Sequence, residues 1–447
     1  MAANSLESPL EALASAPMRA RQYLMVGLCC LINLIDGYDV VSLSYAAPVL
    51  TKEWHTKAQM LGLVFSAASL GLTLGAFLLA PLSDRFGRRP MMLAALVSIT
   101  VSHALTSVAY SIQELIWLRF LMGLGLGLLV VSLNVMVSEY ANDQRRTLLL
   151  ALLHAGFTGG MMLGGVLSAL VLEPFGWRAI FTAGTIINVV LLTLLLVFMW
   201  ESPSFLLRAQ PANALARVNR ILGRLGHAPL AALPPKPVRE RRGGQLAALL
   251  ANEQRVTNLL YWFASLTYAV VGYFLLNWKP KVLVDAGLTP TEAGWIGASV
   301  GVAGILGHLS MGWLSRRGGS IGYTAAYFAL IGVSLLVFGN APNKAMLIAA
   351  AAMLQFFTVG AYTGLFLNAV ELYPPEQRNL GISIMVGFGR LGAIVGPYLG
   401  GVLIGADLGR AQTMGVFAAI SVIPVVALVM LGRGAARQAR SPAAAAV

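Results

Sequence analysis

The stretch YLMVGLCCLINLIDGYDVVSLSYAAPVL, residues 23–50, decides the class of this protein. It is an apolar run long enough to cross a bilayer, since about 20 apolar residues are sufficient. It nevertheless contains two acids, Asp36 and Asp39, three residues apart. An ionisable group inside a membrane span is costly unless it faces a cavity or a partner, and such groups mark ion and substrate pathways. The run therefore predicts a membrane protein that moves a solute and uses carboxylate protonation to do so.

Composition supports a polytopic helical membrane protein. The 447 residues are 57% hydrophobic and 11% charged, with a mean hydropathy of +0.75, whereas soluble domains contain about 25% charged residues. The net charge of +13 would favour a nucleic-acid partner in a soluble protein. Here Lys and Arg fall in alternate loops, as the positive-inside rule predicts. We therefore expect a lipid bilayer as the environment, no nucleic-acid partner and, because the first apolar run is so long, no cleavable signal peptide.

Apolar segments recur along the whole chain and predict an all-α fold with twelve transmembrane helices. Their alternating basic loops and even number place both termini in the cytoplasm. The predicted spans are about residues 22–50, 59–82, 91–110, 113–139, 147–172, 178–200, 257–280, 291–314, 320–340, 344–371, 379–404 and 411–432.

A proline-rich, basic segment divides these spans six plus six. We predict an N-terminal segment (1–21), a six-helix bundle (22–200), a cytoplasmic linker (201–256), a second bundle (257–432) and a cytoplasmic tail (433–447). Within the linker, residues 212–225 can form an amphipathic helix along the membrane. Glycine-spaced helices followed by basic turns occur in both halves, which predicts two pseudo-symmetric bundles.

The turn Pro81-Leu-Ser-Asp84-Arg85-Phe-Gly87-Arg88-Arg89 carries the strongest motif. An Asp at a helix end beside arginines can form a charge network, and Gly87 permits the tight turn. The turn resembles the signature between helices 2 and 3 of the major facilitator superfamily. The resemblance implies the major facilitator fold and a gating role for Asp84, Arg85 and Arg88. The chain departs from the family pattern at Ala80, usually Gly, and at Arg316, which replaces the second Asp.

A narrower resemblance, to the aromatic acid:proton symporters of that superfamily, covers all twelve spans. It implies import of a hydroxybenzoate-, protocatechuate- or benzoate-like carboxylate for aromatic catabolism, a bacterial-type inner membrane, and a need for Asp36 and Asp39 in transport. The matching segments are Asp36-Gly-Tyr-Asp39, Arg119-Phe-Leu-Met-Gly-Leu-Gly-Leu-Gly127, Ser138-Glu139-Tyr140, Gly176-Trp177-Arg178, Glu371-Leu-Tyr-Pro374 with Arg378, and Gly387-Phe-Gly-Arg390-Leu-Gly-Ala-Ile-Val-Gly-Pro397.

The acids of the first span lie on a narrow polar stripe. Asn33, Asp36 and Gly37 follow helical spacing, with Asp39 at the edge of the stripe. Two carboxyl groups this close resist simultaneous ionisation, so one of them can remain protonated. A proton carrier needs such a group, and we predict that this pair couples transport to protons. The alternative is a structural pair neutralised by Arg119 or Arg390.

Candidate substrate contacts come from both halves. Arg390 lies among glycines, where its guanidinium has room to hold a carboxylate. Asn33 lies on the polar stripe, and His154 and Phe157 are one helical turn apart, so these three can touch the ligand. Tyr362 can stack on an aromatic ring.

Other charged residues are candidates for gating. Arg119 lies in the outer part of its helix, beside a glycine ridge. Glu139 and Glu371 lie at the cytoplasmic ends of equivalent helices. Loop arginines follow each of them, so we expect inner-gate charge pairs with Arg145 and Arg378.

The chain contains no nucleotide-binding loop, metal-ligand cluster or nucleophile–base pair, so we expect a carrier rather than an enzyme. We expect it to function as a monomer. No cofactor is expected, and protons are the coupling ion. Lys279 and Lys281 either attract an anion or extend to the headgroups. The alternatives are transport of another organic acid such as muconate, a proton-antiport exporter, and a membrane sensor that binds ligand without transport.

Overall fold

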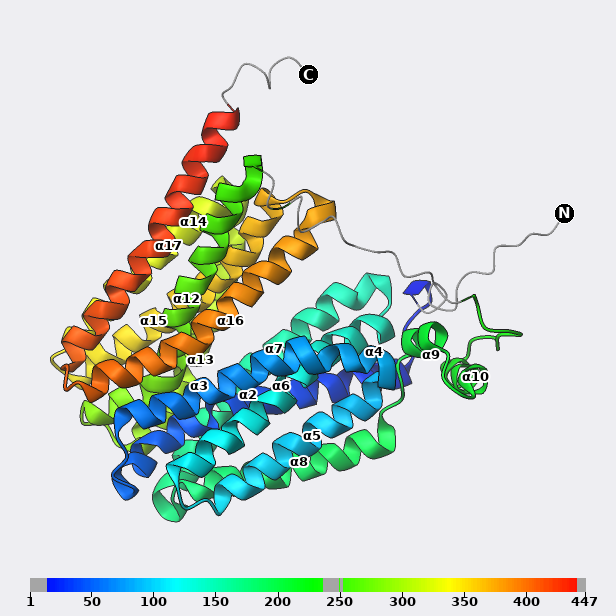
Figure 1. The fold of residues 1–447 in the computed structure, drawn as a ribbon, viewed down its shortest axis with the longest axis horizontal. Helices are drawn as coiled ribbons and strands as arrows, with labels where there is room; N and C mark the ends of the chain where they lie inside the picture. Colours follow the sequence, from blue (N-terminus) through cyan, green and yellow to red (C-terminus); the bar gives the residue numbers. More distant parts are fainter. Residues whose placement is uncertain (1–13, 236–248, 250–251, 440–447) are drawn as a thin grey trace. The chain divides into compact units, whose positions relative to one another are not determined.

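The computed structural model describes residues 14–235, 249 and 252–439, and this part of the chain is built from helices (Figure 1). The longer elements are α2 (Ala20–Glu53), α3 (Ala58–Leu74), α5 (Arg88–Ser107), α6 (Ile112–Tyr140), α7 (Asp143–Phe175), α8 (Arg178–Phe198), α10 (Ala214–Leu225), α12 (Asn252–Asp285), α13 (Pro290–Gly318), α14 (Ser320–Asn340), α15 (Lys344–Leu372), α16 (Pro375–Gly405) and α17 (Arg410–Ala439). The shorter ones are η1 (Gly75–Leu79), η2 (Ala80–Leu82), α4 (Ser83–Phe86) and α9 (Pro203–Ala209).

Twelve helices of the described residues are long and apolar enough to cross a membrane, and each overlaps one predicted span. The second span is continuous from Ala58 to Phe86, because α3 passes through a π-helical turn and a 3₁₀ turn into α4. Such turns tighten or widen a helix locally without ending it. The prediction of an all-α, twelve-helix membrane protein is confirmed.

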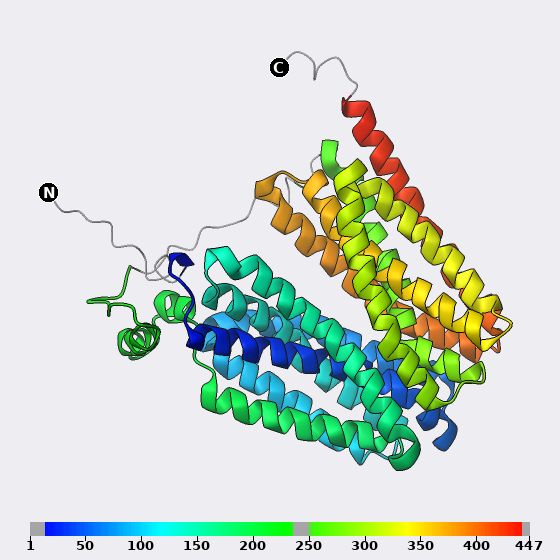
Figure 2. The ribbon, with the colours of Figure 1, turned by 180° about the vertical axis from the view of Figure 1, so that it is seen from behind.

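The chain forms two compact units. Unit 1 comprises residues 1–42, 67–167 and 174–240, and unit 2 comprises residues 43–66, 168–173 and 241–447. In unit 1, α5 packs against both α6 and α8. In unit 2, α12 packs against α16 and α17, and α15 packs against α13 and α14, which Figure 2 shows from behind.

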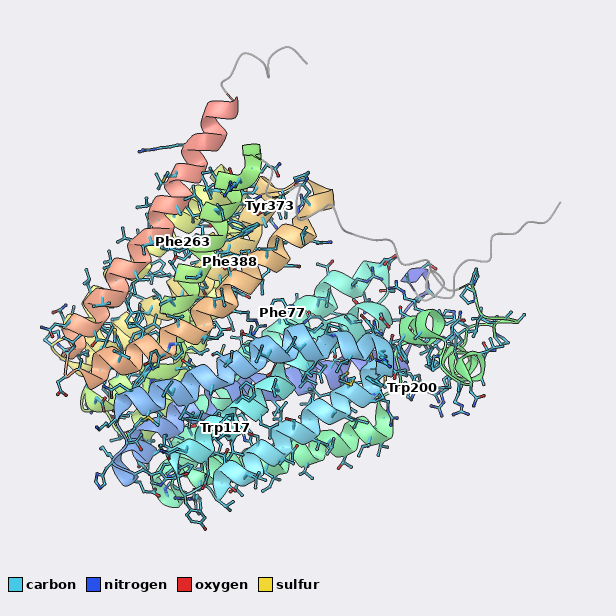
Figure 3. All side chains as sticks on the ribbon, viewed as in Figure 1. Phe77, Trp117, Trp200, Phe263, Tyr373 and Phe388 are labelled. Atoms are coloured by element: carbon cyan, nitrogen blue, oxygen red, sulfur yellow. The ribbon has the colours of Figure 1, made fainter. Side chains whose placement is uncertain are left out.

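The amphipathic helix predicted in the linker is present as α10. Its apolar residues Val218, Leu222 and Leu225 are buried within the protein, so its apolar face is covered by the chain itself. Trp200, labelled in Figure 3, lies between two arginines, with the guanidinium carbon of Arg224 5.1 Å from the ring centroid and that of Arg21 5.9 Å from it.

Helices α2 and α7 approach so closely in unit 1 that a side chain cannot fit between them at Gly160. A Cβ atom there would overlap the carbonyl oxygen of Leu34. A side-chain hydrogen bond reinforces the contact, since Asn33 Nδ2 donates to Leu153 O at 2.7 Å. Small residues that allow backbones to approach are the usual means by which membrane helices associate. The position of the α2 polar stripe therefore depends on this seam.

We predict that Gly160→Ala destabilises the protein by about 1–3 kcal/mol, because the added methyl group overpacks the α2–α7 seam. Gly159→Ala is the matched control, since a Cβ atom at Gly159 meets nothing within 4 Å. Thermal unfolding of the purified variants in detergent measures the effect. Equal unfolding midpoints for the two variants would contradict this view of the seam.

Candidate functional site

Asp39 lies at the centre of a buried polar cluster in unit 1. Its side chain is 1% exposed, and His103 Nε2 of α5 lies 3.2 Å from Asp39 Oδ1. Asn188 Nδ2 of α8 lies 3.3 Å from Asp39 Oδ2 and also donates to Gly184 O at 3.0 Å. Both groups can bind a proton, and their atoms lie at an ion-pair distance, although they are not aligned as a hydrogen bond. The cluster can therefore bind a proton away from water.

Arg119 is a second member of this cluster. It is 1% exposed, and its guanidinium is close enough to the Asp39 carboxyl and Tyr38 hydroxyl groups to interact with them electrostatically. The guanidinium donates to Thr106 Oγ1 at 3.3 Å and lies over the ring of Phe181, 4.8 Å from its centroid. A buried arginine held by a hydroxyl group and an aromatic face has a fixed position, and its charge favours an ionised Asp39. The structure thus brings Arg119 close to the acid stripe. This position is also the one required if Arg119 simply neutralises the two acids in a structural role.

The other predicted residues on the stripe have different environments. Asp36 is 2% exposed, one helical turn before Asp39 on α2. Asn33 is engaged with the α7 backbone, as described above. Phe157 is half-buried and His154 is exposed on α7. Of the predicted contacts in unit 1, His154 and Phe157 are thus the more accessible to a solute.

At the end that carries the α4–α5 turn, unit 1 is held together by a carboxylate that the sequence did not indicate. Glu201 Oε1 accepts hydrogen bonds from Arg88 N at 2.9 Å, Arg89 N at 3.2 Å and Ser202 N at 2.9 Å. The first two amides open α5 and have no partner within their own helix, and the helix dipole favours a negative charge at this position. Gly87 precedes them with φ of +106°, and a side chain there would overlap Glu201. Glu201 therefore fixes the turn between α4 and α5.

The residues with a predicted gating role lie in or near this turn. Asp84 Oδ1 pairs with Arg88 at 2.7 Å, four residues along the chain. The guanidinium carbon of Arg85 lies 5.4 Å from the ring centroid of its neighbour Phe86. Glu139 accepts a hydrogen bond from the hydroxyl of Ser202. Asp84, Arg88 and Glu139 thus meet at one end of unit 1.

Unit 2 uses a similar device. Glu371 Oε1 accepts from Ser320 N at 2.5 Å, the first residue of α14, and Gly319 before it has φ of +81°. Asn368 Oδ1 accepts from Ser320 Oγ at 2.6 Å. Nearby, Tyr373 donates to Asn258 Oδ1 at 2.7 Å, and burial raises the pKa of this tyrosine to about 12, so the hydroxyl keeps its proton. Tyr373 is labelled in Figure 3. Glu371 therefore caps a helix in unit 2 as Glu201 does in unit 1.

The expected charge pairs of Glu139 with Arg145 and of Glu371 with Arg378 do not occur among the ion pairs of the described residues. Arg145 donates to the Tyr23 hydroxyl at 2.5 Å, and Arg378 donates to Val370 O at 3.4 Å. Both glutamates are engaged by backbone or hydroxyl donors instead, because those donors lie at helix starts. The gating role of these four residues remains a prediction.

Arg390 and Tyr362 lie in unit 2. Arg390 is half-buried on α16, and its charge interacts with the Tyr362 hydroxyl group. Tyr362 is 44% exposed and stacks on Tyr268, with ring centroids 6.0 Å apart. Phe388, labelled in Figure 3, stacks on Trp262 at 5.6 Å. Unit 2 thus presents a guanidinium next to an accessible aromatic pair, which suits a ring that carries a carboxylate.

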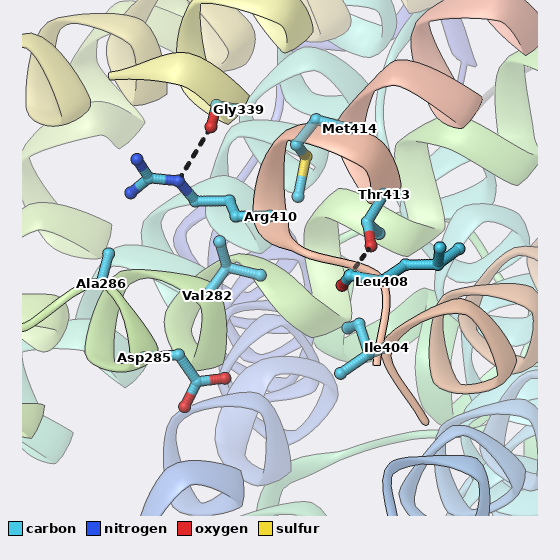
Figure 4. Close-up of a pocket in the computed structure, with 9 residues that line it drawn as sticks. All are labelled: Val282, Asp285, Ala286, Gly339, Ile404, Leu408, Arg410, Thr413 and Met414. Carbon is cyan, nitrogen blue, oxygen red and sulfur yellow. Dashed lines mark hydrogen bonds between the residues drawn. The ribbon is translucent and has the colours of Figure 1, made fainter. Parts of the chain in front are cut away.

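A cavity of about 530 Å³ lies elsewhere in unit 2 (Figure 4). Its polar groups already have partners, since Arg410 donates to Gly339 O at 3.1 Å and Asp285 pairs with Lys281 at 2.7 Å. None of the predicted site residues lines it, so we do not assign it to the substrate. Its lining residues are Val282, Asp285, Ala286, Gly339, Ile404, Leu408, Arg410, Thr413 and Met414.

Four functional candidates were not predicted from the sequence: His103, Asn188, Thr106 and Glu201. A single histidine or asparagine in an apolar helix is most often a packing residue, and here only the fold brings the first three to Asp39 and Arg119. Glu201 acts on Arg88, 113 residues away. The sequence feature that could have indicated this capping role is the position of Glu201 directly after a span, beside Ser202-Pro203.

Comparisons with known proteins agree with this architecture. The family model of the Major Facilitator Superfamily matches residues 29–371 of this chain and, in a second match, residues 262–446. A gallate transporter of Pseudomonas putida is 31% identical over 96% of this chain and 95% of its own length. A 4-hydroxybenzoate transporter of Pseudomonas aeruginosa is 29% identical over 93% and 94%. The crystal structure of a D-xylose-proton symporter is 18% identical, with a TM-score of 0.69 over 92% of this chain and 97% of that one.

We predict that Glu201→Ala destabilises the start of α5 by about 1–3 kcal/mol, because buried backbone amides lose their acceptor. Hydrogen exchange at the amides of Arg88 and Arg89 measures this directly, and their protection should fall. Glu201→Gln is the control, since its amide oxygen can still accept. Unchanged protection in Glu201→Ala would show that the cap is unimportant.

Proposed function

The chain belongs to the Major Facilitator Superfamily, a family of transporters rather than enzymes, and from this premise we propose that it imports an aromatic carboxylate together with protons by alternating access. Relatives named as transporters of gallate, 4-hydroxybenzoate and, at 25% identity, benzoate support the substrate class. The observation that carries the proposal of proton coupling is the buried contact between Asp39 and His103.

Proton binding at Asp39 is chemically reasonable in this setting. The ionised carboxylate is favoured by Arg119 and by the Asn188 amide, whereas the neutral form is favoured by exclusion from water. These opposed influences allow the group to change its protonation state as its surroundings change. Asp36, one turn away, is the second carboxyl group of the coupling pair.

Coupling to protons also meets an energetic need. Moving a carboxylate into a negatively charged interior costs about 2.3 kcal/mol per 100 mV for each charge. One accompanying proton cancels that charge, and a second makes the membrane potential favour import. We propose that the substrate carboxylate is held by Arg390 while the ring lies against Tyr362.

The remaining parts of the proposal concern the setting. The carrier acts as a monomer in the inner membrane of a bacterial-type cell, with both termini in the cytoplasm. The distribution of Lys and Arg supports this orientation. Asp84, Arg85, Arg88, Arg119, Glu139, Glu371 and Arg378 are proposed to control the closing of the two sides.

We predict that Asp39→Asn abolishes accumulation driven by an inward pH gradient but preserves exchange between internal and external substrate, because Asn mimics the protonated acid and cannot release the proton. Uptake and counterflow of labelled 4-hydroxybenzoate, gallate and benzoate in proteoliposomes measure the two activities. Asp285→Asn, which removes an acid at the end of α12, is the control and should retain both.

Two results would contradict the proposal. Gradient-driven accumulation that persists in Asp39→Asn would remove Asp39 from coupling. Absence of uptake for all three compounds by the folded wild-type protein would overturn the aromatic-acid assignment.

A further inference from the structure

The membrane spans of the second half of the chain contain cations but almost no acids. No Asp or Glu occurs between Arg255 and Val284, between Gly294 and Val370, or between Arg378 and Ala406. Most cations in these stretches are exposed (Arg316, Arg317 and Lys344) or paired with an acid (Lys281), whereas Lys279 on α12 and Arg390 on α16 are half-buried. A charge inside a membrane protein is costly without a partner of opposite sign. Lys279 and Arg390 are thus half-buried positive charges of unit 2 that form no ion pair among the described residues.

Lys279 has a neutral partner. Its Nζ donates to Gln355 Oε1 of α15 at 2.7 Å, and no carboxylate of the described residues lies within 4.0 Å of it. The contrast with nearby lysines is clear, since Lys281 pairs with Asp285 at 2.7 Å and Lys344 pairs with Glu292 at 3.1 Å. An amide oxygen satisfies one of the three donors of the ammonium group but supplies no negative charge. The ammonium group of Lys279 therefore has donors left with which to bind an anion.

An aromatic seam between α12 and α15 connects the surroundings of the two cations. Tyr268 stacks on Tyr362 and donates to Thr358 O at 3.0 Å. Arg390 interacts with Tyr362, whereas Lys279 is bonded to Gln355, seven residues earlier on α15. Seven residues correspond to about 10 Å along a helix. Seven residues are also about two helical turns, so Gln355 and Tyr362 lie on the same face of α15, with Lys279 bonded to the first and the charge of Arg390 near the second.

We propose that Lys279 and Gln355 form a second carboxylate-binding site in unit 2, so that the preferred substrate is an aromatic dicarboxylate. One carboxylate binds the Lys279 ammonium group and the Gln355 amide N–H, and the other binds Arg390. The benzene ring lies against the Tyr268–Tyr362 pair. The proposal rests on the proposed function and deepens it, because it names the substrate class within the aromatic acids.

The charges balance in this arrangement. The two carboxylates neutralise the two cations, so the loaded unit 2 carries no net internal charge. A dianion is opposed by the membrane potential twice as strongly as a monoanion. Electroneutral import then requires two protons, and unit 1 offers two buried carboxyl groups, Asp36 and Asp39, to carry them.

Binding to the purified full-length protein in lipid nanodiscs tests the proposal, with benzene-1,4-dicarboxylate and benzoate as probes. We expect the dicarboxylate to bind wild type at least about tenfold more tightly than benzoate, because it adds a charge-assisted contact. Lys279→Gln should remove this preference and leave benzoate affinity within about twofold of wild type. Lys279→Arg retains the charge and should retain most of the preference.

Lys281→Gln is the matched control, since that lysine lies two residues further on and is already paired with Asp285. It should leave both affinities unchanged. A dicarboxylate that binds wild type no more tightly than benzoate would overturn the inference, as would a preference that survives in Lys279→Gln. In both cases benzoate binding would leave the proposed function standing. Wild type that binds neither probe would overturn this inference, and the uptake of 4-hydroxybenzoate, gallate and benzoate would then decide the proposed function.

Discussion

A carboxylate inside a membrane span must find its donors within the protein, and the arrangement of unit 1 follows from this requirement. Asp39 sits on α2, and its partners come from α5 and α8 through His103 and Asn188, while α6 contributes Arg119. Four helices are thus tied to one buried group. The close contact of α2 with α7 at Gly160 sets the position of α2 and hence of Asp39. A change in the packing of α2 against α7 would therefore also move Asp39 relative to its partners.

In both units, a carboxylate also satisfies the free amide groups at the start of a helix. A helix that starts after a tight turn has free amide groups, and in each unit a glutamate from another part of the chain accepts from them. Glu201 does this for α5 and Glu371 for α14. Each turn contains a glycine with positive φ, Gly87 in unit 1 and Gly319 in unit 2. Both glycines belong to the turn pattern that repeats in the two halves of the sequence. The glutamates come from unequal positions, because Glu201 follows the last span of its half whereas Glu371 ends the fourth.

The membrane spans, the linker helix and the buried state of Asp36 and Asp39 could be predicted because each depends on local sequence. Apolar length identifies a span, and an acid within it is visible without knowledge of its neighbours. The partners of these acids could not be predicted in this way. His103 and Asn188 are single polar residues in apolar helices, and nothing local distinguishes a ligand of Asp39 from a packing residue. Similarly, the expected partner of Glu139 was the nearby Arg145, but the fold brings Ser202 to it from 63 residues away.

In the function proposed above, the two halves of the sequence bind ligands of opposite charge. The first half holds Asp36 and Asp39, whose charge disappears on protonation, together with Arg119, and the second holds Lys279 and Arg390, which we propose bind the substrate anion. Protonation makes the membrane interior more positive by one charge, and binding of a carboxylate makes it more negative by one. Loading both leaves the net charge unchanged, whereas loading either alone changes it in a medium that penalises charge. Electrostatics therefore provides a reason for the two ligands to move together even if no residue contacts both.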